Sequence, residues 1–383
     1  MNLKTLLLSS DEKAVHILRR VLSDLEIGVE HCFAADEAIL LITRQRYEAI
    51  IVDASNREKA ASVLEVAKAA PINKRALTIV LVESSVGLKG GFDMGAHFVL
   101  YKPFAVERAK ASFRAVRAMM RRERRLQLRI PVEVPIECYG SGRYKATTID
   151  ISEGGMAIQF MGRVAKDESI RVSFELPGMG RKLDINGDLA WETEGDKAGV
   201  RFTNATDEQR MLIQQWMNGQ LPEPEPDGDP PVNCHLTDLS HGGCYLTTTS
   251  PFPRGTRIIL SIKTADFHIR TGGIVLVAHP EFGMGVEFLQ TTREQRDQAH
   301  RMVKTLRKIA DKSPEIQVEP DGLVTASPDD SLAAFQSAAT DPGVEDTLLD
   351  LFRYQFQAPV EIFLHHMREQ RPDVEAQLHA RSR

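Results

Sequence analysis

The sequence lacks the features that define several protein classes. Its four cysteines show no Cys-x-x-Cys spacing, so we interpret them as reduced thiols rather than as disulfides or zinc ligands. No apolar run is long enough for a membrane-spanning helix, and the short apolar run at the N-terminus does not suit a signal peptide. The formal net charge is only -5, so no overall basic field would attract nucleic acid. We therefore expect a cytoplasmic protein without a membrane span, in which any polyanion site is local.

Patterns of catalysis are missing as well. We find no Ser/His/Asp set, no cluster of metal ligands and no phosphate-binding loop in a convincing context, and the adjacent His365 and His366 are interpreted as solvated tail residues. No basic helix-turn-helix pattern is present, so direct DNA binding is not expected. The prediction is a protein that is not an enzyme and that has neither a metal nor a cofactor.

The length of 383 residues exceeds one ordinary core and predicts several domains. Residues 221–229 alternate proline with acidic residues and are expected to form an extended linker. Residues 312–345 are rich in Pro, Asp, Ser and Ala, which predicts disorder. Residues 346–383 are predicted to be a helical tail. It is either a packed C-terminal helix or a segment that docks on a partner protein, and the sequence leaves both open.

Residues 1–120 alternate between short apolar runs and helical patterns. Apolar residues follow the spacing i, i+3, i+4, i+7 from Val15 to Leu25, which is typical of an amphipathic helix. Regular alternation of strand and helix predicts a doubly wound parallel α/β sheet. The expected strands are 5–8, 29–33, 49–53, 77–82 and 98–101.

This N-terminal domain resembles the receiver domain of response regulators. Asp53 ends the third expected strand, where that family has its phosphoacceptor, and Lys102 precedes a proline as in the family's Lys-Pro motif. The acidic pair that binds Mg²⁺ in the family is replaced by Ser9 and Ser10, and Glu83 stands where the family has Ser or Thr. Weak Mg²⁺ binding and repulsion of a phosphorylated aspartate by Glu83 predict a pseudo-receiver. We expect Asp53 to be held by Lys102 as a vestigial site.

Residues 121–311 contain a duplication. The run Asp150–Ile158 (DISEGGMAI) recurs 88 residues later as Asp238–Leu246 (DLSHGGCYL), and Gly199–Phe202 (GVRF) recurs 86 residues later as Gly285–Phe288 (GVEF). Alternating apolar and polar residues predict antiparallel β-barrels. We expect two copies of one barrel domain, at 121–220 and 230–311, each ending in a helix.

Five arginines precede the first copy of the repeated run. Arg121 and Arg122 are interpreted as solvated residues at a helix end. Arg125 and Arg129 are interpreted as ligands for an anion, because planar guanidinium groups bind phosphate oxygens in pairs and also stack on purines.

The repeated run itself suits a guanine nucleotide. The Asp150 carboxylate can accept from the N1–H and N2–H₂ edge of guanine, and Ser152 adds a small donor and acceptor. Gly154 and Gly155 are expected to allow positive φ and close approach of the backbone to a flat ligand.

The arginines and the run together resemble the PilZ domain family across residues 121–218. The segment RRLQLRIPV (124–132) matches that family's RxxxR motif, and DISEGG (150–155) matches its (D/N)xSxxG motif. The resemblance implies a cyclic di-GMP site in which Arg125 and Arg129 hold phosphate and guanine and Asp150, Ser152 and Gly155 hold a second guanine edge. Arg124 is added because the family often has a preceding arginine there.

The second copy departs from this pattern. Asp238, Ser240 and Gly243 are present, but Ile213 and Met217 stand at the positions of the two arginines, and no Lys or Arg occurs from Met211 to Pro253. We expect this copy to keep the fold and to lose the ligand. An arginine supplied from elsewhere in the fold is the alternative.

These features lead to three function hypotheses. The first is a non-enzymatic cyclic di-GMP effector that signals by domain rearrangement or by docking on a protein partner of unknown identity. The absence of Gly and Pro from Ala105 to Ile130 predicts a helix that joins the receiver-like domain to Arg125 and Arg129. The second is a response regulator controlled by phosphorylation of Asp53. The third is a ligand-free scaffold for protein contacts. The sequence reveals neither the cellular output nor the oligomeric state.

Overall fold

The structure, a computed structural model, contains two compact units. Residues 1–122 and 229–383 form one unit, and residues 123–228 form the other. The structure describes residues 3–369 apart from 84–93, 161–168, 194–195, 204, 222–228, 264–267, 291–292, 310–314, 324–345, 355–357 and 359. Most of the expected 221–229 linker, the second part of the 312–345 segment and the end of the tail therefore lie outside the described residues.

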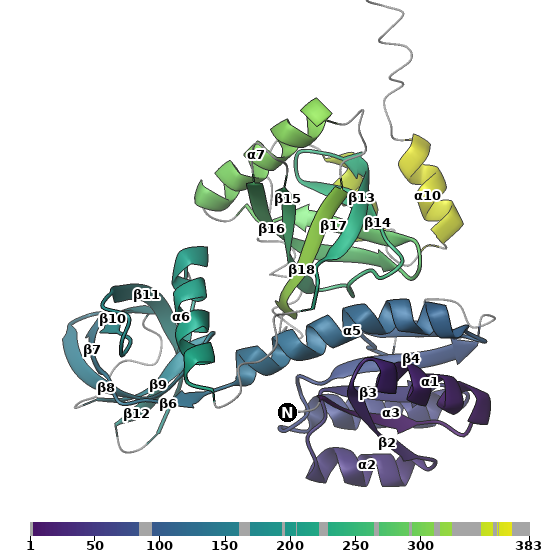
Figure 1. The fold of residues 1–383 in the computed structure, drawn as a ribbon, viewed down its shortest axis with the longest axis horizontal. Helices are drawn as coiled ribbons and strands as arrows, with labels where there is room; N and C mark the ends of the chain where they lie inside the picture. Colours follow the sequence, from purple (N-terminus) through teal and green to yellow (C-terminus); the bar gives the residue numbers. More distant parts are fainter. Residues whose placement is uncertain are drawn as a thin grey trace, which may run out of the picture. The chain divides into compact units, whose positions relative to one another are not determined.

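The N-terminal sheet is five-stranded and parallel, with the order β2-β1-β3-β4-β5 (Figure 1). This is the order of flavodoxin-like doubly wound folds, and the predicted fold class is confirmed for this region. Its strands are β1 (Leu3–Leu8), β2 (Ile27–Cys32), β3 (Ala49–Asp53), β4 (Leu77–Glu83) and β5 (Phe98–Lys102).

Helices cover both faces of this sheet because its strands alternate buried residues toward each side. Leu7, Ile51 and Ile79 pack with helices α1 and α5, whereas Leu6 and Ile50 pack with α2 and α3. Buried side chains on both faces leave little freedom in strand register. The helices are α1 (Glu12–Asp24), α2 (Ala35–Arg44), α3 (Arg57–Ala69) and α5 (Val106–Gln127).

Helix α5 is continuous over 22 residues, as the missing Gly and Pro predicted. Within the unit formed by residues 1–122 and 229–383, it also contacts the second barrel. Arg117 and Arg121 pair with Asp229, and the Arg122 Nη2 atom lies 2.8 Å from Asp321 Oδ1. The interpretation of Arg121 and Arg122 as solvated is therefore wrong, because Arg122 is buried and both guanidinium groups have carboxylate partners.

Residues 130–202 form the first barrel, a ring of six antiparallel strands closed by the pairing of β8 with β9. A short strand, β6, adds to β8, and the helix α6 (Asp207–Gly219) buries Ile213, Trp216 and Met217 against the barrel core. The strands are β6 (Ile130–Pro131), β7 (Pro135–Tyr139), β8 (Arg143–Ser152), β9 (Gly155–Phe160), β10 (Ser169–Glu175), β11 (Lys182–Glu192) and β12 (Lys197–Phe202).

The second barrel is also closed, with the order β13-β14-β17-β16-β15-β18. The predicted duplication is visible in detail, because both barrels carry a bulge before the repeated aspartate and another where β11 pairs with β12 and β16 with β17. Its strands are β13 (Val232–Leu239), β14 (Gly243–Thr247), β15 (Thr256–Lys263), β16 (His268–His279), β17 (Gly283–Phe288) and β18 (Glu315–Leu323), and α7 spans Arg293–Ile309.

The two barrels differ in the origin of one strand. In the first, β7 pairs with β8 and β10 and comes from ahead of the repeated run. In the second, β18 makes the equivalent pairings with β13 and β15 but follows α7 in the chain. The expectation of disorder across 312–345 is therefore wrong for residues 315–323. The second barrel continues beyond residue 311, because without β18 its sheet would have two open edges.

Among the helices that the structure describes, none combines the length and the apolar character needed to span a bilayer.

Candidate functional site

Strand pairing in the first barrel brings the predicted arginines to the repeated run. Ile130 and Pro131 of β6 pair with Ile151 and Asp150 of β8. This pairing leaves the preceding residue, Arg129, beside the end of β8. Its Nη1 atom donates to Asp150 Oδ1 over 2.7 Å. The Arg129 side chain is 47% exposed and that of Asp150 is 23% exposed, so both charges remain accessible to an incoming ligand.

Arg124 and Arg125 lie on the last turn of α5, where cations suit the negative end of the helix dipole. Both are half-buried. The amide of Leu128 donates to the carbonyl oxygens of both residues, which ends the helix. Arg129 follows two residues after the helix. The five-position RxxxR spacing is thus divided between a helix end and the start of a strand.

Ser152 and Gly155 shape the turn after Asp150. The Ser152 hydroxyl is buried and donates to the Gly155 carbonyl over 2.9 Å, so it stabilises the turn. A Cβ atom on Gly155 would overlap the carbonyl oxygen of Val200 on β12, so the glycine is required by close strand packing. Neither Gly154 nor Gly155 adopts the positive φ that glycine allows. Gly154 faces open space, because no atom of the described residues lies within 4 Å of an added Cβ.

Two further side chains belong to this surface. Arg201 on β12 pairs in register with Gly155 and is exposed. Trp191 on β11 is 43% exposed, and its indole lies over Gly199, two residues before Arg201. A guanidinium and a flat aromatic ring beside an arginine–aspartate pair can serve an anionic base-containing ligand by ion pairing and stacking. Sequence reasoning missed both residues.

Comparison with known proteins identifies the domain family of both barrels. The sequence profile of the PilZ domain family matches residues 121–219 and again 221–305. The chain carries two PilZ domains in tandem. No curated protein shows significant similarity to the chain.

Solved structures resemble separate parts of the chain. The PilZ domain of CeSA from a cellulose-synthesizing bacterium is 18% identical and covers 24% of this chain and 96% of its own, with a TM-score of 0.21. The chemotaxis response regulator CheY4 of Vibrio cholerae is 21% identical and covers 30% of this chain and 99% of its own, with a TM-score of 0.28. A response regulator from Chloroflexus aurantiacus is 20% identical. The match covers 30% of this chain and 98% of that protein, with a TM-score of 0.28.

The second PilZ domain repeats the turn but not the arginines. The Ser240 hydroxyl donates to the Gly243 carbonyl over 3.3 Å, as Ser152 does to Gly155. Glu287 occupies the position of Arg201, opposite Gly243 in register. The sequence ahead of its repeated run has no counterpart of the arginine motif, since no Lys or Arg occurs from Met211 to Pro253. A basic residue does reach the turn from elsewhere, since Arg307 of α7 lies 3.4 Å from the His241 ring.

The receiver-like domain holds Asp53 in a closed network. Lys102 Nζ donates to both carboxylate oxygens over 3.0 Å, and the hydroxyls of Ser9 and Ser55 donate to them over 2.7 Å. Burial opposes the charge on Asp53, but the hydrogen bonds from Ser55, Ser9 and Lys102 prevail and lower the pKa of this carboxyl. The predicted Asp53–Lys102 pair is confirmed.

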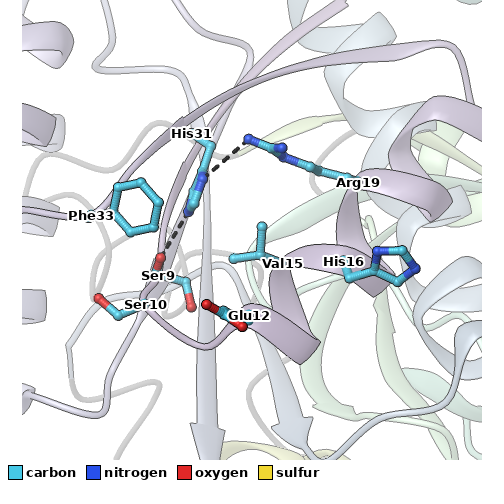
Figure 2. A pocket seen from close by; sticks show the side chains of 8 residues that line it. All are labelled: Ser9, Ser10, Glu12, Val15, His16, Arg19, His31 and Phe33. Atoms are coloured by element: carbon cyan, nitrogen blue, oxygen red, sulfur yellow. Dashed lines mark hydrogen bonds between the residues drawn. The ribbon is translucent and has the colours of Figure 1, made fainter.

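A pocket beside this network contains both an acidic and a basic side chain, Glu12 and Arg19 (Figure 2). Ser9 and Ser10 line it together with His16 and His31. The His31 ring bridges the Ser9 carbonyl and the Arg19 guanidinium. In the portion of the chain covered by the structure, no group of three His, Cys, Asp or Glu side chains could hold a metal ion.

Proposed function

We propose that this chain is a non-enzymatic receptor for cyclic di-GMP and that the first PilZ domain binds the dinucleotide. The observation that carries the proposal is the Arg129–Asp150 pair beside the open Gly154 turn. A cyclic dinucleotide carries two phosphates and two guanine edges. The pair offers a phosphate ligand and a guanine acceptor at one place.

The neighbouring side chains complete the binding surface. Arg124 and Arg125 supply further guanidinium groups from the end of α5. Arg201 adds positive charge on the other side of the turn, and Trp191 offers a face on which a guanine can stack. Ser152 and Gly155 act by holding the turn, so their substitution would disturb the position of Asp150 rather than remove a ligand contact.

Binding would compete with the Arg129–Asp150 ion pair. Exposed pairs of this kind contribute about 0–1 kcal/mol, so separating them costs little. The freed carboxylate can then accept from guanine N–H groups while the guanidinium binds phosphate. The site is thus closed by a weak internal contact that the ligand replaces with stronger, charge-assisted ones.

Signal transmission would use the helix that carries two of the arginines. Helix α5 runs from the receiver-like domain to Arg125 without a break. Capture of Arg124 and Arg125 by the ligand would fix the last turn of this helix and so change the arrangement of the domains at its two ends. Small-angle scattering of the full chain should differ with and without cyclic di-GMP, and identical curves would contradict this route.

Titration calorimetry of the full chain with cyclic di-GMP tests the binding itself. We expect saturable heat for the natural sequence and its loss in Arg125→Ala. Arg181→Ala is the matched control, since Arg181 is an exposed arginine of the same domain that pairs with Glu208 instead. Absence of heat in the natural sequence, or equal affinity in Arg125→Ala and the control, would overturn the proposal.

A further inference from the structure

The C-terminal helices α9 (Thr347–Tyr354) and α10 (Val360–Glu369) pack on the second PilZ domain. They form an apolar cluster with the outer face of β14 and β16 that is separate from the barrel core. The barrel contributes Tyr245, Ile274, Leu276 and Val277 to this cluster, and the helices contribute Leu348, Leu349, Leu351, Phe352, Phe363 and Met367.

The start of α9 lies on the repeated turn. One carboxylate oxygen of Asp346 accepts from the Gly242 amide over 2.9 Å, and the other accepts from the Leu349 amide, which caps the helix. A Cβ atom on Gly242 would overlap the Leu349 side chain. The equivalent glycine of the first domain, Gly154, faces open space. The same turn is therefore open in one domain and occupied in the other.

The middle of α9 covers the neighbouring strand. The Phe352 ring lies against Gly285 of β17, whereas the equivalent Gly199 is covered by Trp191 of its own barrel. The next residue, Arg353, pairs with Glu287, which is buried. Glu287 occupies the position of the exposed Arg201. The charge on the barrel has thus been inverted, and the helix supplies the matching cation.

The strand face beneath the helices also differs from the equivalent face of the first domain. Ile274 and Leu276 of β16 stand 86 residues after Asp188 and Ala190, which the first domain leaves at least partly exposed. Tyr245 stands 88 residues after Ala157 and adds a large ring that contacts both Phe352 and Phe363. Residues that are small or charged in the first domain are thus replaced by large apolar or aromatic residues under the helices, which suits helix-in-groove recognition.

We propose that residues 346–369 are an intramolecular ligand of the second PilZ domain, seated on the turn and strand face that correspond to the nucleotide surface proposed for the first. The Asp346 carboxylate takes the backbone N–H of the turn, and Leu349, Phe352 and Phe363 fill the apolar face. Residues 324–345 tether the segment to β18, so its local concentration is high enough for modest intrinsic affinity to suffice. The proposal goes beyond the nucleotide site and is tested without nucleotide.

Hydrogen exchange of the full chain tests the proposal by comparing substitutions at two aromatic residues of α9. Phe352 is fully buried against the barrel, whereas Tyr354 is 81% exposed. We expect Phe352→Ala to raise exchange at the α9 amides and at the Gly242 amide at least tenfold, and Tyr354→Ala to leave both unchanged. Equal exchange in the natural chain and in Phe352→Ala would overturn the proposal.

A second measurement uses a peptide of residues 344–371 with a fluorescent label. A chain ending at residue 345 should bind this peptide, and the full chain should bind it at least tenfold more weakly because its own segment occupies the surface. A Phe352→Ala peptide should lose binding, and a Tyr354→Ala peptide should keep it. Equal binding to both chains would contradict intramolecular docking. So would a full chain that is dimeric by light scattering and becomes monomeric on truncation, because the occupant would then be a second copy's segment.

Discussion

The two PilZ domains share a strand order, two bulges and a serine-held turn, yet they present opposite surfaces at that turn. The first exposes Arg129, Asp150 and Arg201 around an uncovered glycine. The second places Glu287 under an arginine of α9 and covers its glycine with Leu349. The difference shows that the turn is part of the fold. In our proposals, the side chains around the turn determine whether a nucleotide or a helix binds there.

The difference has a topological origin. The first domain begins with the segment that carries the arginines and continues into β7. The second takes its corresponding strand, β18, from after its terminal helix. The origin of this strand and the presence of a leading arginine segment therefore differ together between the two domains.

The largest expected effect comes from removing the arginine that is proposed to bind phosphate in the first domain. Arg129→Ala removes charge-assisted hydrogen bonds worth about 1.5–3 kcal/mol each. Two such bonds to phosphate correspond to a roughly 100- to 10,000-fold weaker affinity for cyclic di-GMP, by titration calorimetry. Arg307→Ala in the second domain is the matched control and should leave affinity unchanged. A larger loss in Arg307→Ala than in Arg129→Ala would reverse the assignment of the two domains.

A buried ion pair contrasts with the exposed pair of the ligand site. The side chains of Asp53 and Lys102 are 5% and 9% exposed, so Asp53→Asn leaves a buried cation poorly compensated and should cost about 3 kcal/mol at neutral pH. Hydrogen exchange of the β3 amides measures this loss. Asp150→Asn, in the exposed pair, should change stability by less than about 1 kcal/mol.

The Asp53 effect depends on pH with a defined sign. Its pKa is lowered in the folded protein, so the carboxylate stabilises the fold above the pKa of the unfolded state, about 4. This stability is lost as the pH falls through the folded-state pKa. The difference between the natural chain and Asp53→Asn should therefore shrink below about pH 4. A difference that stays constant down to pH 2 would contradict the role of the charge.

The glycines of the two turns should respond differently to the same substitution. Gly242→Ala forces Leu349 away and should destabilise the docked α9 by about 1–3 kcal/mol, the usual cost of overpacking. Gly154→Ala meets open space and should leave stability within about 0.5 kcal/mol. Exchange of the α9 amides reports the first effect, and thermal unfolding reports the second. Equal destabilisation by both substitutions would contradict the contact between Gly242 and Leu349 as the cause.

The smallest expected effect comes from giving the first domain the charge of the second. Arg201→Glu reproduces the residue at position 287 and should weaken cyclic di-GMP binding at least tenfold, since one charge-assisted contact is worth about 1.5–3 kcal/mol. Arg201→Gln should fall between the natural chain and Arg201→Glu. An unchanged affinity in Arg201→Glu would remove this residue from the site.

Much of the fold followed from local patterns. Apolar runs located all five strands of the parallel sheet, and β3 was predicted at its observed bounds. The repeated aspartate and glycine residues revealed the duplicated barrel. Strand β18 could not be placed in this way, because its partners β13 and β15 lie far away in sequence and its flanking residues have the composition of disordered segments. Pairing over such distances is decided by the closed barrel as a whole.

Site residues that belong to a sequence motif could be predicted. Site residues that reach the site only through strand register could not. Arg129 and Asp150 were expected together and form an ion pair. Arg201 becomes visible only when its register with Gly155 is known, although the replacement of this arginine by Glu287 in the second copy was a usable signal. The roles of Ser152 and Gly155 also needed coordinates, since hydroxyl direction and strand spacing are not readable from residue type.

Titration of the full chain with cyclic di-GMP, comparing Asp150→Ala with Asp238→Ala, tests the central contrast most directly. The two aspartates stand at the same position of the duplicated turn, so folding effects should be similar in both variants. We predict that Asp150→Ala weakens binding at least tenfold and that Asp238→Ala leaves it unchanged. Binding that survives in Asp150→Ala and disappears in Asp238→Ala would contradict the assignment of the nucleotide to the first domain and of the helix to the second.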